Sequence, residues 1–432
     1  MLASAACAAL TFVCTPASGA ANLETTMSSP AAYSANQAVD SFYASRRGAP
    51  LWLRAGAESS AARELIGILD RAPLDGLDSG PALAAEARAL IARAQTGDTA
   101  ALASADRLLS TAWVLYVEAL QRPPAGVVYA DSWVRPRRQS PAQILTQAAA
   151  APSLPAFVRK ISEVNPLYAQ LRDTAWADMQ RNGGQIDPRV LTSLDRVREH
   201  PFQNRYIIVD TAAARLYMID DGQIAGTMKV IVGKAAPGTQ TPMLASTIYY
   251  ATLNPYWHVS PDLVRSLIAR NVLDQGLGYL KTHGYQVMPA DPNDDSLLDP
   301  AKVDWHAVAN GQLQVRVREL PGPANSMGRI KFGFANKWDI YLHDTPVKSL
   351  FAQDDRDLSH GCIRLQDAER LGAWMLGRDP RADSHDPELN VPLPTPVPIY
   401  ITYLTAQANN GELSYVDDIY GLDQASEVAA LH

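Results

Sequence analysis

The sequence predicts an α+β protein in which an all-helical first part is followed by a β-rich second part. Apolar residues recur with the helical period of 3.6 from Ala38 to about Glu199. Beyond that point they recur with the period of two that is typical of strands. The β-rich part also contains Cys362, the one cysteine outside the first twenty residues. These observations predict a helical domain at about 38–200 and a second domain at about 201–405.

The first twenty residues, MLASAACAALTFVCTPASGA, carry no charged side chain. Residues 5–13 form an apolar core, and the small residues Ser18, Gly19 and Ala20 follow it. This pattern predicts a secretory signal peptide that is cleaved after Ala20. Because no Lys or Arg precedes the apolar core, a structural N-terminal helix is the alternative. Residues 21–37, rich in Ala, Ser, Thr and Asn, are expected to form a flexible lead-in.

The chain has 432 residues and a formal net charge of −7. This length suffices for two or three domains with substantial cores. The negative charge argues against a nucleic-acid partner, which would require a basic surface. After the first twenty residues, no stretch reaches the roughly 18 to 20 apolar residues that a membrane span needs. Leu108–Leu120 comes closest, but polar residues interrupt it. The mature chain is therefore expected to lack a membrane span.

The helical pattern of the first domain divides into seven segments. The expected helices cover residues 60–72, 82–94, 99–121, 141–149, 154–163, 166–182 and 188–198. Asp98 or Thr99 is a candidate N-cap for the third helix, and Pro123 and Pro124 end it. None of these helices carries a cluster of histidines or carboxylates suited to metal binding or acid–base catalysis. The first domain is therefore interpreted as a helical scaffold.

The second domain is expected to consist mainly of strands. They cover residues 206–209, 214–219, 224–232, 247–253, 330–334, 338–342 and 391–403, with helices near 261–268 and at 368–376. Asp221-Gly222 predicts a hairpin between the second and third strands. A further hairpin is expected around Asn310-Gly311, with residues 315–318 on its second arm.

The stretch YLHDTPVKSLFAQDDRDLSHGCIRL, residues 341–365, carries the candidate chemistry. A lone thiol near histidines suggests a nucleophile. His343 follows a strand and precedes Cys362 by 19 positions, so two adjacent strand ends can bring the imidazole to the thiol. A neighbouring histidine or a helix N-terminus can lower the pKa of a thiol. Gly361 permits a tight turn, so the amides of Gly361 and Cys362 are candidates for an oxyanion hole. These parts suggest acyl transfer through a thioester.

Each candidate residue has a structural alternative. Cys362 could be a small buried apolar residue, His343 a hydrogen-bonded core histidine, and Asp344 the cap of a turn. His360 could support the site or only shape its loop. A metal site is disfavoured because no paired-cysteine spacing accompanies the histidines.

The sequence supports two roles for Arg364 equally. Its planar guanidinium could bind a substrate carboxylate, or it could pair with Asp355 or Asp357 of the same loop.

Ser359-His360-Gly361-Cys362-Ile363-Arg364, together with His343 upstream, resembles the signature of L,D-transpeptidases with a YkuD-type catalytic domain. Further short motifs match those of the family and occur in the same order along the chain. They are IVGK at 231–234, TP at 241–242, NPYW at 254–257, MGRIK at 327–331 and YLHDTP at 341–346. Together they are similar to the large, lid-bearing (YcbB-like) subgroup. The resemblance is strong over about 200–405 and weaker over 38–180.

The resemblance implies a β-sandwich catalytic domain over 201–405 with an inserted lid subdomain at about 258–335, followed by a C-terminal tail, 406–432. It also implies a periplasmic enzyme without a cofactor that acts on peptidoglycan stem peptides. In the family, the cysteine attacks the L,D bond before the terminal D-alanine of a donor tetrapeptide. A diaminopimelate amine of the acceptor then resolves the thioester and forms a 3–3 cross-link. Carbapenems acylate the same thiol.

Carried over to this chain, the resemblance makes Cys362 the nucleophile and His343 the base. In the family a third group, often a backbone carbonyl, orients the histidine, and Asp344 occupies the adjacent position. The amides of Gly361 and Cys362 would form the oxyanion hole. The candidate substrate-binding residues are Tyr341, Trp257, His360 and Arg364.

Two departures from the subgroup are apparent. Many members of the subgroup have a small residue at the position of His360. With His360, this chain instead has the His-Gly-Cys signature of the wider family. No room exists between about 172 and 204 for the usual peptidoglycan-binding domain, so a cell-wall synthesis protein is a candidate recruiting partner. Two other functions remain as alternatives. An L,D-carboxypeptidase would resolve the thioester with water, whereas a non-catalytic wall-binding scaffold would be expected to lack Cys362 or His343.

Overall fold

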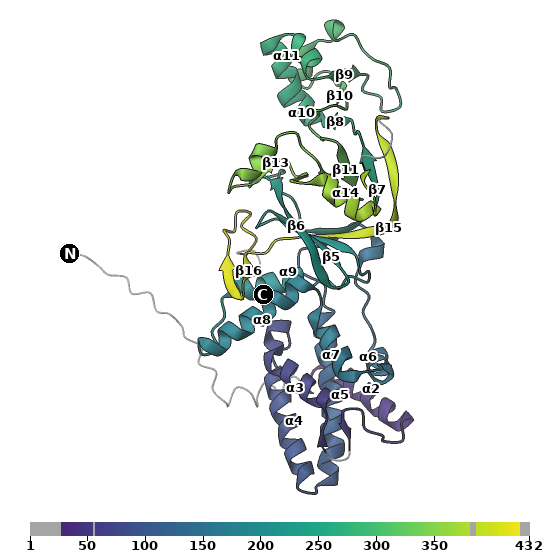
Figure 1. The fold of residues 1–432 in the computed structure, drawn as a ribbon, viewed down its shortest axis with the longest axis vertical. Coiled ribbons are helices and arrows are strands. Elements are labelled where there is room, and N and C mark those ends of the chain that lie inside the picture. Colours follow the sequence, from purple (N-terminus) through teal and green to yellow (C-terminus); the bar gives the residue numbers. More distant parts are fainter. Residues whose placement is uncertain (1–26, 55–56, 381–385, 424–432) are drawn as a thin grey trace, which may run out of the picture. The chain divides into compact units, whose positions relative to one another are not determined.

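A computed structural model describes residues 27–54, 57–380 and 386–423 of the chain, which divide into two compact units (Figure 1). The helical unit contains the residues up to Pro124, residues 136–200 and a short segment, 407–414. The β-rich unit contains residues 125–135, 201–406 and those from Tyr415 onward. The α+β prediction is confirmed. The expected signal peptide lies outside the described residues.

The helical unit is built from eight helices within the described residues. They are α2 (Pro30–Ser45), α3 (Ser60–Arg71), α4 (Gly80–Gln95), α5 (Thr99–Leu120), α6 (Pro141–Ala150), α7 (Leu154–Glu163), α8 (Pro166–Arg181) and α9 (Pro188–Val197). The seven predicted helices are all present. The prediction of a flexible lead-in is wrong for its last residues, because α2 begins at Pro30 after an N-cap by Ser29.

The helix ends follow local capping rules, which is why the sequence located them well. Asp98 accepts a hydrogen bond from the amide of Ala101 and begins α5. Side chains with the helical period bury one face of α3, including Leu65 and Leu69. A buried carboxylate, Asp75, accepts hydrogen bonds from the hydroxyls of Tyr116 and Tyr168 at 3.0 and 2.7 Å. These interactions serve packing and agree with a scaffold role.

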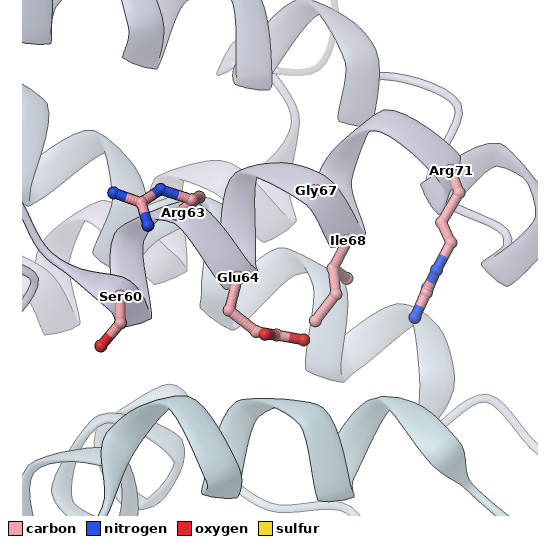
Figure 2. A pocket seen from close by; sticks show the side chains of 6 residues that line it. All are labelled: Ser60, Arg63, Glu64, Gly67, Ile68 and Arg71. Atoms are coloured by element: carbon pink, nitrogen blue, oxygen red, sulfur yellow. The ribbon is translucent and has the colours of Figure 1, made fainter.

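A groove of the helical unit follows the exposed side of α3 (Figure 2). It is lined by Ser60, Arg63, Glu64, Gly67, Ile68 and Arg71. Glu64 pairs with Arg159 of α7 at 2.7 Å, and Arg71 donates to Ser162 at 3.4 Å. The lining contains no thiol or imidazole. These contacts join α3 to α7, and the groove is not a candidate active site.

The β-rich unit contains a ten-stranded sheet that curls back on itself, because β7 pairs with both β15 and β11. Its strands are β3 (Val128–Tyr129), β4 (Tyr206–Asp210), β5 (Arg215–Asp220), β6 (Gln223–Gly233), β7 (Leu244–Leu253), β11 (Ile330–Gly333), β12 (Tyr341–His343), β13 (Asp357–Ser359), β14 (Ile363–Leu365) and β15 (Leu389–Thr402). The path runs β11-β12-β14-β6-β5-β4-β15-β7-β3, with β13 beside β6. Inward-facing residues and α14 (Ala368–Leu376) form one core.

Two local predictions in this unit have different outcomes. Asp221 and Gly222 both have positive φ, 47° and 74°, and join the antiparallel strands β5 and β6, so the predicted hairpin is confirmed. The strand expected at 338–342 begins only at Tyr341. The Asn336 carboxamide accepts hydrogen bonds from the amides of Trp338 and Ile340, both at 3.0 Å, and folds the preceding residues into a loop.

A small subdomain has its own sheet and core within the β-rich unit (Figure 1). Its strands are β8 (Trp257–Val259), β9 (Tyr285–Met288) and β10 (Arg316–Glu319), in the order β8-β10-β9. Its helical segments are α10 (Pro261–Leu263), a π-helical turn (Val264–Ile268), α11 (Ala269–Gln275), α12 (Gly278–Thr282) and α13 (Trp305–Ala309). This is the segment expected to be the lid. Its expected boundary at 335 is too late, because β11 belongs to the large sheet.

The hairpin predicted around Asn310-Gly311 is wrong. Both residues follow α13, and Gly311, at φ 77°, follows the helix end as a C-terminal glycine commonly does. β10 pairs instead with β8 and β9. The expected C-terminal tail is also partly structured: β16 (Ala406–Asn409) pairs with β17 (Glu412–Tyr415). Among the described residues, no helix has the length and apolar character of a membrane span.

Candidate active site

The thiol and the imidazole lie on neighbouring strands. β12 and β14 run parallel, with Leu342 opposite Ile363 and His343 opposite Arg364, and Cys362 directly precedes β14. Leu342 and Ile363 are fully buried in the core. Since side chains alternate along strands, His343 shares the opposite face of the sheet with Cys362. The predicted juxtaposition of two strand ends is therefore present.

His343 is almost fully buried, with 2% of its surface exposed. Its Nδ1 lies 2.6 Å from the main-chain carbonyl of Asp344. A carbonyl can only accept, so Nδ1 carries the proton and Nε2 keeps a free lone pair. Burial lowers the pKa of His343 to about 3, and the positive charges of Arg364 and Lys331 contribute. The imidazole is therefore a neutral proton acceptor at neutral pH.

Asp344 contributes to this arrangement through its backbone. Its carboxylate accepts hydrogen bonds from the Arg329 amide at 2.9 Å and from Nζ of Lys348 at 2.6 Å. Gly328 lies directly against that carboxylate, and a Cβ at Gly328 would collide with Oδ2. The orienting group expected at this position is therefore the Asp344 carbonyl, and the carboxylate anchors the peptide that carries it.

Cys362 is partly exposed and is the free cysteine of the described residues. Its Sγ donates to the carbonyl of Asp339 at 3.7 Å. Burial raises the pKa of the thiol, although hydrogen bonding from Tyr341 and the charge of Arg364 oppose this. The expectation that a histidine or a helix N-terminus lowers this pKa is not met. The resting pair is a neutral thiol and a neutral imidazole.

The loop before the thiol is held by its own hydrogen bonds. Gly361 has a φ of 114°, a conformation that favours glycine. Its amide donates to Ser359 Oγ at 3.1 Å, and Ser359 Oγ donates to the Cys362 carbonyl at 2.6 Å. The prediction that the Gly361 amide faces an oxyanion is therefore not met here. Apart from hydrogen bonds between paired strands, the Cys362 amide has no acceptor among the described residues. It therefore remains a candidate donor to the oxyanion.

A second layer that the sequence did not reveal supports this loop. Thr241 Oγ1 accepts from the Gly233 amide at 2.9 Å and donates to the Gly361 carbonyl at 2.8 Å. The hydroxyl of Tyr420 donates to the Gly233 carbonyl at 2.6 Å and accepts from the Thr241 amide at 3.4 Å. Tyr420 is 8% exposed. No local pattern marked it, because the two partners of its hydroxyl are more than 170 positions away.

The predicted substrate-binding residues have different surroundings. Tyr341 is half-buried and lies beside Cys362; burial and the thiol raise the pKa of its hydroxyl. His360 is exposed, and partial burial with the charges of Lys234 and Arg364 lowers its pKa. Trp257 packs on the core of the small subdomain, with its ring 6.3 Å from that of Tyr285. Its role in substrate binding stays a prediction.

Arg364 is half-buried, and burial lowers its pKa. Across 27–54, 57–380 and 386–423, its guanidinium has no hydrogen-bond or ion-pair partner, so the expected alternative of pairing with Asp355 or Asp357 is not realised. Lys331 of β11 was missed by the sequence analysis. It is the antiparallel partner of His343, and its Nζ lies 5.2 Å from the centre of the Tyr341 ring. Within the described ranges, no group of three or more His, Cys, Asp or Glu is arranged to hold a metal.

These features define a protein with a thiol–imidazole site on a curled sheet. Residues 204–399 match the YkuD family, an L,D-transpeptidase catalytic domain, and residues 37–174 match the Scaffold family, a scaffold domain. A Haemophilus influenzae protein provisionally named an L,D-transpeptidase is 25% identical over 401 residues, covering 90% of this chain and 79% of that protein.

Two solved structures are also similar. An L,D-transpeptidase from Mycobacterium smegmatis is 16% identical and covers 46% of this chain and 58% of its own, with a TM-score of 0.24. L,D-transpeptidase 3 from Mycobacterium tuberculosis, in complex with a faropenem-derived adduct, is 13% identical and covers 46% and 60%, with a TM-score of 0.23. The chain spans less than two thirds of either solved chain.

The chain therefore contains a YkuD-type L,D-transpeptidase catalytic domain together with a Scaffold domain. YkuD domains are cysteine-dependent L,D-transpeptidases, so the resemblance read from the sequence is confirmed at the level of the domains.

Proposed function

We propose that this protein is a periplasmic peptidoglycan L,D-transpeptidase that forms 3–3 cross-links, with Cys362 as nucleophile and His343 as base. The observation that carries the proposal is the contact of His343 Nδ1 with the Asp344 carbonyl at 2.6 Å. The hydrogen bond from Nδ1 to the Asp344 carbonyl leaves Nε2 as an acceptor on the face of the sheet that carries the thiol. The matches to the YkuD family and to the Scaffold family support the same function.

In the first step, Sγ of Cys362 attacks the carbonyl carbon of the third residue of a donor tetrapeptide. The thiol proton passes to Nε2 of His343 as the S–C bond forms. The Cys362 amide is the candidate donor to the oxyanion. The C–N bond to the terminal D-alanine then breaks, and His343 returns the proton to the leaving amine. A thioester and free D-alanine result.

In the second step, the side-chain amine of an acceptor diaminopimelate attacks the thioester. His343 accepts the amine proton and returns it to sulfur, so the thiol is regenerated and an amide is formed. If water takes the place of the amine, the same site is an L,D-carboxypeptidase. A non-catalytic wall-binding role is disfavoured because the thiol, the imidazole and its orienting carbonyl are all in place.

The neutral resting state suits this chemistry. A protonated thiol beside a neutral imidazole reacts slowly with solutes that cannot engage the base, so deprotonation accompanies attack on a bound acyl group. This arrangement differs from a preformed thiolate–imidazolium pair, because both the raised thiol pKa and the lowered imidazole pKa disfavour charge separation between Cys362 and His343.

Intact-mass spectrometry of residues 21–432 after incubation with a carbapenem tests the nucleophile, with Cys362→Ala as the control. We expect one covalent adduct on the wild type and none on the variant. A folded wild type without an adduct would contradict the proposal. Donor and acceptor muropeptides then separate the two outcomes: a cross-linked dimer supports transfer, whereas a tripeptide product alone supports the carboxypeptidase.

A further inference from the structure

His343 has a cation on each side. Its register partner on β14 is Arg364, and its register partner on β11 is Lys331. Directly opposed residues on neighbouring strands have Cβ atoms roughly 5 Å apart, and all three side chains share one face of the sheet. Both positive charges act on the imidazole, since they help to hold its pKa down. A basic side chain is therefore within reach on either side of Nε2.

The two cations differ in how they are held. Arg364 has no hydrogen-bonding or ionic partner among the described residues, and it is half-buried next to the thiol. Nζ of Lys331 lies over the Tyr341 ring and 3.8 Å from a carboxylate oxygen of Glu388, with only 22% of the lysine side chain exposed. That distance is longer than a hydrogen bond, so Lys331 keeps donor capacity for a ligand.

Other acidic groups nearby are committed or lie elsewhere. The Asp344 carboxylate is bonded to Lys348 and to the Arg329 amide. Glu388 also interacts with the Tyr256 amide at 3.2 Å and His258 at 3.4 Å. Asp339 is exposed and offers its carbonyl to the thiol. Two partly desolvated cations around one imidazole therefore favour an anionic ligand directly above His343.

We propose that Lys331 and Arg364 form a two-cation subsite that binds the terminal α-carboxylate of the donor stem peptide. This inference rests on the proposed function. The amine that His343 must protonate and the terminal carboxylate are attached to the same Cα of the leaving D-alanine. When that amine faces Nε2, its carboxylate must lie beside the imidazole, where the two cations are. The subsite thereby selects donors that end in a free carboxylate one residue after the scissile bond.

The test compares two synthetic tetrapeptide donors, one ending in D-alanine and one in D-alaninamide. Acylation is followed without an acceptor, by thioester mass and by amine release, so that an acceptor carboxylate cannot contribute. We expect the wild type to acylate faster with the free acid by ten-fold or more, because hydrogen bonds to charged groups are the stronger ones. Lys331→Met should slow the free acid by about ten-fold and change the amide by less than two-fold.

Arg364→Met should act in the same direction, and Lys331→Arg should restore most of the preference because it keeps the charge. Lys160→Met removes an exposed charge from α7 and is the matched control. Equal acylation of both donors by the wild type would overturn the subsite while leaving the proposed function intact, and so would an equal loss on both donors in Lys331→Met. A wild type that acylates with neither donor would overturn the proposed function and this inference with it.

Discussion

Nδ1 of His343 donates a hydrogen bond to the main-chain carbonyl of Asp344 at 2.6 Å, and the carboxylate of that same residue is used elsewhere. The orienting group of the imidazole is therefore neutral. The carbonyl fixes the tautomer, and its hydrogen bond raises the pKa of the ring only in part against burial. Burial and the charges of Arg364 and Lys331 outweigh this hydrogen bond and the Asp344 charge, both of which raise the pKa of the ring, so His343 stays unprotonated far below neutral pH.

The acidic limb of the pH–rate profile should lie well below pH 6. The pKa of His343 is about 3 in the folded protein against an ordinary value of 6.5, so its protonation does not limit acylation near neutrality. The same shift affects stability. Between pH 6.5 and 3 the unfolded chain binds a proton at this histidine that the folded chain does not bind. The contribution of His343 to the free energy of unfolding is therefore complete above pH 6.5 and is lost as the pH falls toward 3.

Carbapenem acylation rates between pH 5 and 8, with stability followed by denaturant melts, check this prediction. A rate that falls with an inflection near 6.5, while the protein stays folded, would show that the imidazole is more solvated than the structure indicates.

Asp344→Asn should keep most of the acylation activity. The asparagine oxygen can still accept from the Arg329 amide, and the carbonyl that orients His343 is unchanged. The lost ion pair with Lys348 is partly exposed, with 48% of the lysine side chain in solvent, so its contribution is small. We expect a loss of a few-fold in the rate, against a loss of at least a hundred-fold for His343→Ala. Equal losses in the two variants would mean that the carboxylate charge itself supports the base.

Tyr420→Phe should slow acylation and lower the free energy of unfolding. The hydroxyl bridges the carbonyl of Gly233 and the amide of Thr241, and Thr241 in turn holds the Gly361 carbonyl beside the thiol. Removing it leaves two buried backbone groups without that partner, at a cost of about 1–3 kcal/mol.

Tyr33→Phe removes an exposed hydroxyl that accepts a hydrogen bond from Gln37, so it serves as the control. Urea melts give the stability, and carbapenem acylation measured well below the melting transition gives the rate. A destabilised Tyr420→Phe variant with an unchanged acylation rate would restrict Tyr420 to a structural role.

Alkylation of Cys362 by iodoacetamide should accelerate with pH only above the range of an ordinary thiol. Burial raises the pKa of this thiol more than Tyr341 and Arg364 lower it, so the thiolate is scarce at neutral pH. The alkylation rate against pH, read by mass spectrometry with a small thiol compound as reference, reports the inflection. An inflection below that of the reference would indicate a preformed thiolate.

The helices were predictable because their signals are local. Caps such as Asp98, and apolar residues three and four positions apart, lie within one segment and act whatever surrounds them. The turn at Asp221-Gly222 was predictable for the same reason. Asn310-Gly311 was misread because the same dipeptide suits a hairpin and a helix end, and the pairing of β10 with β8 and β9 decided between them.

The sequence by itself determined the two-part architecture and the residues of the candidate site. A thiol–imidazole pair and its family were identified from the spacing of His343 and Cys362 and from the sequence motifs around them. Only the tertiary structure decided how that pair is supported. Strand register set Lys331 and Arg364 on either side of His343, and the Tyr420 hydroxyl bonds Gly233, 187 positions away at the end of β6. Such contacts depend on which strands become neighbours, and no local pattern in the chain encodes that choice.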